Sequence, residues 1–133
     1  MPVTAWVIDD SAVARQMSTY YLHEAGCVVV GEADNAFKGL GLFRQRRPKV
    51  VTLDRMMPRQ FNVDSIELLR TMKREMREVA VIVVTVLQFD RTRANFLEED
   101  VLAYVVKPLT QMSFEPARTR LRQIFPELAD AQT

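Results

Sequence analysis

The sequence has few of the residues that build zinc sites and disulfides. Its 133 residues include one cysteine, Cys27, and one histidine, His23. A zinc site needs at least three protein ligands, usually cysteine and histidine, so this composition argues against one. A single thiol cannot form an internal disulfide, which favours a reducing, cytoplasmic location.

Long apolar runs and a charge excess are also lacking. No stretch approaches the ~18 apolar residues of a membrane span, and the N-terminus lacks the features of a signal peptide. The 18 lysines and arginines nearly balance the 17 aspartates and glutamates, which argues against direct nucleic-acid binding. We find no linker and no second-domain pattern. We therefore expect one domain over residues 1–133, with no output domain and no membrane attachment.

What the sequence does contain is a fivefold alternation of short apolar runs and amphipathic stretches. Runs that are apolar throughout indicate strands buried on both faces, hence a parallel sheet covered by helices on each side. The pattern predicts an α/β fold. We expect strands over residues 5–8, 28–30, 50–53, 79–85 and 103–106, and helices over 11–26, 35–46, 64–77, 90–99 and 112–128, the last with a break near Pro126.

Helix boundaries can be predicted from capping residues. Asp10 or Ser11 can cap the first helix, and Gly26 can close it. Asp64 and the glutamate three residues later match a capping box, which places the start of the third helix. Pro48 ends the second helix.

Charged and hydroxyl side chains stand at the carboxyl ends of four of the five expected strands: Asp9 and Asp10, Asp54, Thr85, and Lys107. Each alone is more typical of a cap or a turn. The carboxyl ends of parallel strands, however, lie at one edge of the sheet, where open α/β sheets bind ligands. Their convergence therefore predicts a functional site.

The chemistry of this group points to phosphoryl transfer. Three carboxylates at close range repel one another, and a hard cation such as Mg²⁺ removes that repulsion. Thr85 can donate a hydrogen bond to a phosphoryl oxygen, and Lys107 can supply a positive charge. Asp54 can act as a nucleophile and form an aspartyl phosphate.

The sequence resembles the receiver domain of bacterial two-component response regulators, in the single-domain, CheY-like form, over essentially its whole length. The order and spacing of several motifs carry the resemblance: Asp9-Asp10, Asp54 followed by Met57-Pro58, Thr85, Tyr104 and Lys107-Pro108. It implies a flavodoxin-like (βα)5 fold, a doubly wound five-stranded parallel sheet in the order 2-1-3-4-5.

The resemblance implies that Asp54 accepts a phosphoryl group from a histidine kinase or a phosphotransfer protein. It implies Mg²⁺ as the cofactor, held by Asp10, Asp54 and the backbone carbonyl of Met56, with Asp9 acting mainly through water. The protein would catalyse its own phosphorylation and dephosphorylation without being an enzyme in the usual sense.

For the other residues, the resemblance implies a switch. Thr85 and Lys107 would hold the phosphoryl oxygens, Tyr104 would change rotamer, and the Lys107–Pro108 peptide would be cis. A downstream protein would bind the face formed by the fourth helix, fifth strand and fifth helix, and phosphorylation could drive homodimerisation. The stretch VIDDSAVARQM is similar to the start of chemotaxis regulators, which suggests chemotaxis or a phosphorelay.

The sequence departs from the family pattern in three places. The loop between Asp54 and Asp64 is longer than usual. Its Phe61 either folds over the acidic crevice, offers a docking point for a partner, or packs on the third helix. Ser65 stands where the family usually has glycine. Val86 stands where alanine or glycine is usual, so it could narrow phosphoryl access.

Two other functions remain open at this stage. One is a constitutive interaction module, a receiver fold that no longer switches. The other is a small hydrolase similar to the haloacid dehalogenases, which would require a second aspartate at the position of Met56.

Overall fold

The computed structural model describes residues 2–57, 63–86 and 100–128. Its five strands are all parallel and lie in the order β2-β1-β3-β4-β5, as the resemblance implied. Their bounds are β1 Thr4–Ile8, β2 Val28–Ala33, β3 Val50–Asp54, β4 Ala80–Thr85 and β5 Ala103–Val106.

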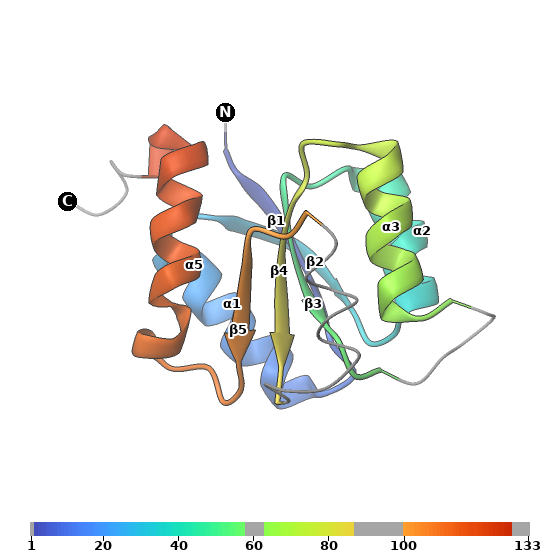
Figure 1. Cartoon of the computed structure of the whole chain (residues 1–133), viewed down its shortest axis with the longest axis horizontal. Helices are drawn as coiled ribbons and strands as arrows, with labels where there is room; N and C mark the ends of the chain where they lie inside the picture. The colour runs from blue at the N-terminus through green and yellow to red at the C-terminus, as the bar shows by residue number, and fades with distance from the viewer. Residues whose placement is uncertain (1, 58–62, 87–99, 129–133) are drawn as a thin grey trace.

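The helices that the structure describes lie on both faces of this sheet. In Figure 1, α1 and α5 cover one face, and α2 and α3 cover the other. Their bounds are α1 Ala12–Glu24, α2 Ala36–Arg46, α3 Ser65–Glu75 and α5 Gln111–Ile124. The helix expected over residues 90–99 lies outside the described residues, as does Phe61. None of the described helices combines the length and apolarity needed to cross a membrane.

The sheet divides the hydrophobic core into two clusters. Side chains alternate between the two faces of a strand, so Val7 belongs to one cluster and its neighbour Ile8 to the other. Phe114 and Leu121 of α5 pack in the first cluster, and Phe43 of α2 packs in the second. All residues of β3 and β4 are buried, as expected for the centre of a doubly wound sheet.

Polar side chains cap the helices where the sequence predicts them. The Ser11 hydroxyl accepts a hydrogen bond from Ala14 N at 3.2 Å, and an Asp64 oxygen accepts one from Glu67 N at 3.0 Å. Gly26 follows the end of α1 with a φ of 96°, a conformation in which glycine avoids the strain of a side chain. These caps confirm where α1 and α3 begin.

Strand β2 runs to Ala33 instead of ending near Val30. Its register with β1 shifts between Ala5 and Trp6, so that Ala5 pairs with Val29 but Trp6 pairs with Gly31. A glycine followed by a charged residue is not a typical strand signal. The added length comes from pairing with β1, which the local sequence does not reveal.

Helix α5 ends at Ile124, at the break expected near Pro126 and short of the predicted residue 128. The residue before a proline is sterically disfavoured in helical geometry, and Phe125 before Pro126 accordingly leaves it, with ψ at 84°. Residues 126–128 then form a short 3₁₀ turn. A second proline, Pro116, lies inside the helix.

Candidate functional site

The carboxyl ends of β1 and β3 bring three carboxylates together. Asp9 and Asp10 follow β1, and Asp54 is the last residue of β3. One oxygen from each lies within 4.8 Å of the others. Asp9 and Asp54 are buried, whereas Asp10 is exposed. The structure therefore assembles the acidic group that the strand ends predict.

Lys107 lies between the two buried carboxylates. Its Nζ is 2.8 Å from Asp9 Oδ2 and 3.5 Å from Asp54 Oδ2. Burial alone would lower the pKa of Lys107, but the hydrogen bond with Asp9 and the charge of Asp54 outweigh it, so its pKa is raised. The ammonium therefore stays charged. The Lys107–Pro108 peptide is cis, as the resemblance implied.

Asp54 is less readily ionised than an ordinary aspartate. Burial raises its pKa from 3.8 to about 7, and the charge of Asp9 acts in the same direction. The hydrogen bond from Met56 N to Oδ1, at 3.0 Å, and the charge of Lys107 oppose that rise. One lysine thus compensates only part of the charge of three carboxylates.

Thr85 ends β4 beside this group. It is fully buried, and its carbonyl accepts a hydrogen bond from Lys107 N at 2.7 Å, so the ends of β4 and β5 are tied together. The next residue, Val86, is 60% exposed, and Met56, two residues after Asp54, is 50% exposed. Whether Val86 restricts phosphoryl access stays a prediction.

Tyr104 lies on β5, paired with Val83 of β4. Its ring packs against the cluster on the α2 and α3 side of the sheet, and its hydroxyl is shielded from solvent. The side chain thus stands on the strand that leads directly to Lys107. Its role as a switch stays a prediction.

Two residues that donate hydrogen bonds to backbone carbonyls of the site were not among the site residues predicted from the sequence. Arg15 of α1 donates from Nη1 to the Asp9 carbonyl at 2.7 Å and from Nε to Glu32 at 2.8 Å. The Ser65 hydroxyl donates to the Asp54 carbonyl at 2.7 Å. Arg15 lies one helical turn after Ser11, a spacing that turns it back towards the loop. For Ser65, the only signal was its replacement of the usual glycine.

The donor set fits a hard divalent cation. Asp9, Asp10 and Asp54 supply only oxygen ligands, with more negative charge than Lys107 balances. Mg²⁺ prefers such oxygens and normally keeps several waters, and the exposed Asp10 leaves a side open to water. The residues present therefore match the cofactor that the resemblance implied.

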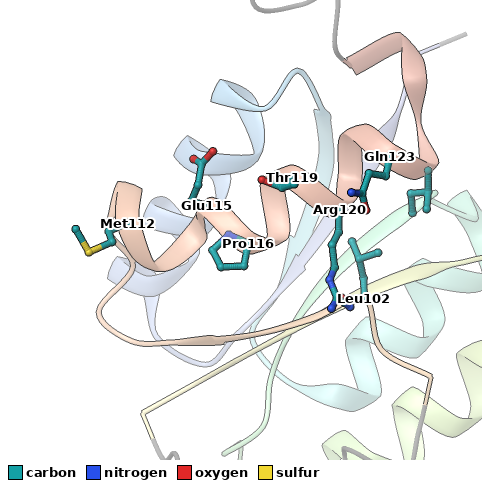
Figure 2. Close-up of a pocket in the computed structure, with 8 residues that line it drawn as sticks. Leu102, Met112, Glu115, Pro116, Thr119, Arg120 and Gln123 are labelled. Carbon is teal, nitrogen blue, oxygen red and sulfur yellow. The ribbon is translucent and has the colours of Figure 1, made fainter.

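A separate hollow of about 770 Å³ lies along α5, next to the start of β5. Figure 2 shows its lining, which comes from α5 and from Leu102 just before β5. Met112 at one end is 87% exposed and Ile124 at the other is 48% exposed. None of the acidic-site residues lines it.

Comparison with known proteins gives consistent matches. A family model described as the response regulator receiver domain matches residues 5–117. The transcriptional regulatory protein BtsR of Escherichia coli K12 is 31% identical over 118 residues, which are 88% of this chain and 47% of that protein. The chain spans about half the length of the curated relatives it matches. The single domain without an output domain therefore stays a prediction.

Solved structures share the fold. The REC domain of AraT, a response regulator from Geobacillus stearothermophilus, matches with a TM-score of 0.82 and 21% identity, covering 96% of this chain and 98% of that one. A chain of the CheX–CheY–BeF3–Mg²⁺ complex from Borrelia burgdorferi matches with a TM-score of 0.78 and 20% identity, covering 94% and 90%.

Proposed function

This chain belongs to the family of response regulator receiver domains, and from that premise we propose that Asp54 accepts a phosphoryl group from the phosphohistidine of a histidine kinase or phosphotransfer protein. The observation that carries the proposal is the position of Asp54, buried beside Asp9 and within 3.5 Å of the Lys107 ammonium. A nucleophile, a charge partner and ligands for a cation thus meet at one point.

In the proposed reaction, a carboxylate oxygen of Asp54 attacks the phosphorus. The new O–P bond forms as the P–N bond breaks, and the imidazole of the donor leaves with the bonding electrons. Mg²⁺ held by Asp10, Asp54 and the Met56 carbonyl, with Asp9 acting through water, would neutralise the phosphoryl oxygens. The Lys107 ammonium and the Thr85 hydroxyl would hold those oxygens.

The proposed output is a change in protein contacts. Thr85 and Tyr104 lie on adjacent strands, β4 and β5, and we propose that they pass the phosphorylation state to the face that includes β5 and α5. A downstream protein, or a second copy of the chain, would bind there without direct nucleic-acid contact. We place this reaction in the cytoplasm, in chemotaxis or a phosphorelay. The free thiol of Cys27 supports the cytoplasmic location.

The test is phosphorylation by acetyl phosphate in the presence of Mg²⁺, followed by intact-protein mass spectrometry. We expect the wild type to gain one phosphoryl group and Asp54→Asn to gain none. Asp34→Asn removes an aspartate outside the cluster and should be labelled like the wild type. Labelling that persists in Asp54→Asn, or that is unaffected by removing Mg²⁺ with EDTA, would contradict the proposal.

Val86 favours a second candidate, a receiver that binds partners without switching. Its branched side chain follows Thr85 directly and is 60% exposed, at the edge where a phosphoryl donor would approach. Beryllofluoride with Mg²⁺ separates the two candidates. A change in the fluorescence of Trp6 or Tyr104 supports the switch, and an unchanged spectrum supports the constitutive module. We do not propose the hydrolase, since Met56 occupies the position of its second aspartate.

A further inference from the structure

We propose that Ser65 is a positioning residue for the phosphoacceptor, an inference that rests on the proposed function of Asp54. The Ser65 hydroxyl donates a hydrogen bond to the Asp54 carbonyl at 2.7 Å. Both residues are 3% exposed, so water does not compete for the bond. Its length is typical of a well-formed O–H···O hydrogen bond.

The bond fixes one side of the peptide unit that follows Asp54. On the other side of the same unit, Arg55 N donates to the Val84 carbonyl at 3.2 Å. A peptide unit is planar, so holding its oxygen and its nitrogen together sets the orientation of the whole plane. The Cα of Asp54 belongs to that plane. The direction in which the carboxylate leaves the backbone therefore depends on both bonds.

The same peptide unit also positions Met56. Met56 N donates to Asp54 Oδ1 at 3.0 Å, which closes a short loop between the side chain of Asp54 and the backbone two residues later. A rotation of the 54–55 peptide would disturb this bond. Ser65 thus acts on the carboxylate and on the Met56 backbone at once.

Ser65 can do this because it stands on a rigid element. It is the first residue of α3, directly after the N-cap Asp64. Leu68, Leu69 and Met72 of the same helix are fully buried. The hydroxyl therefore connects the end of β3 directly to the start of α3. The glycine usual in the family at this position offers no donor.

The experiment compares Ser65→Ala and Ser65→Gly with Ser18→Ala, which removes another buried serine hydroxyl, 1% exposed, from α1. Phosphorylation rates with acetyl phosphate are measured over a range of Mg²⁺ concentrations, well below each melting temperature. We expect both Ser65 variants to lower the maximal rate on the order of tenfold and to raise the half-saturating Mg²⁺ concentration, because a small misplacement is costly in catalysis. Ser18→Ala should change neither value, and Ser65→Thr, which keeps a hydroxyl, should restore both.

The inference is overturned if Ser65→Ala or Ser65→Gly matches Ser18→Ala. It is also overturned if Ser65→Thr is as slow as Ser65→Ala while melting like the wild type. Wild-type protein that is not labelled at all contradicts the proposed function instead. In that case, Mg²⁺ titration followed by NMR still tests the role of Ser65. The Ser65→Ala variant should bind Mg²⁺ more weakly than the wild type, and its Asp54 carbonyl ¹³C resonance should be shifted. An unchanged Mg²⁺ affinity and an unchanged resonance would overturn the inference.

Discussion

At the residue scale, Gly31 makes room for Trp6. A Cβ at Gly31 would lie 2.2 Å from Cη2 and 2.3 Å from Cζ3 of the indole. Trp6 is 4% exposed and packs in the cluster that contains Ile8 and Phe43, so the ring cannot move aside freely. We expect Gly31→Ala to destabilise the protein by about 1–3 kcal/mol, as overpacking typically does.

Urea unfolding followed by the fluorescence of Trp6 measures this effect. Trp6 is the single tryptophan of the sequence, so the signal reports the packed ring directly. A shift of its emission in the folded variant would show where the ring has moved. A variant as stable as the wild type, with unchanged emission, would contradict the close approach of the ring to Gly31.

The residues that meet at the carboxyl edge of the sheet could be predicted from the sequence, but the hydrogen bonds that orient them could not. Asp9, Asp54 and Lys107 each follow an apolar run, and parallel strands bring such ends together regardless of side-chain detail. The bond from Ser65 to the Asp54 carbonyl joins residues 11 positions apart. It depends on how α3 meets β3 in space, which no local pattern specifies.

At the scale of elements, α2 contains two glycines in opposite environments. A Cβ at Gly41 would meet nothing within 4 Å, whereas one at Gly39 would lie 2.8 Å from Cδ1 of the buried Ile8. Glycine costs a helix about 1 kcal/mol relative to alanine. We therefore expect Gly41→Ala to stabilise the protein by about 0.5–1 kcal/mol. Gly39→Ala should be less stable than the wild type because its methyl group crowds β1.

The two variants control for each other, since both make the same chemical change in one helix. Urea midpoints at equal protein concentration give the comparison. Equal stabilisation by both substitutions would show that α2 can shift away from β1 without cost, and would contradict the tight packing of Gly39 on Ile8.

Element boundaries show what local sequence can and cannot specify. The start of α3 was predictable because Asp64 caps it with its own side chain. The end of β2 was not, because its last residues pair with β1 through a register shift at Trp6. The end of α5 carried a signal in Pro126, since a proline disfavours helical geometry in the residue before it. The expected strand order came from the family resemblance, because pairing between distant strands leaves no local trace.

At the scale of the whole molecule, the negative charge of the acidic site destabilises the folded state. The pKa of Asp54 is about 7 in the folded chain, against 3.8 for an ordinary aspartate. Between these values the folded protein binds a proton that the unfolded chain has released. The contribution of Asp54 to the stability of the metal-free protein should therefore fall as the pH rises from about 4 to about 7, and should be constant above that range.

The amide introduced by Asp54→Asn cannot ionise, so this variant should lack this dependence of stability on pH. Without Mg²⁺, we expect the variant to melt at a higher temperature than the wild type near pH 8, and the difference to shrink as the pH falls towards 4. Adding Mg²⁺ near pH 8 should raise the melting temperature of the wild type more than that of the variant, since a ligand of the folded state stabilises it. Circular dichroism melts with EDTA and with Mg²⁺ measure both effects. Parallel pH profiles for the two proteins would mean that the burial of Asp54 beside Asp9 carries no net electrostatic cost.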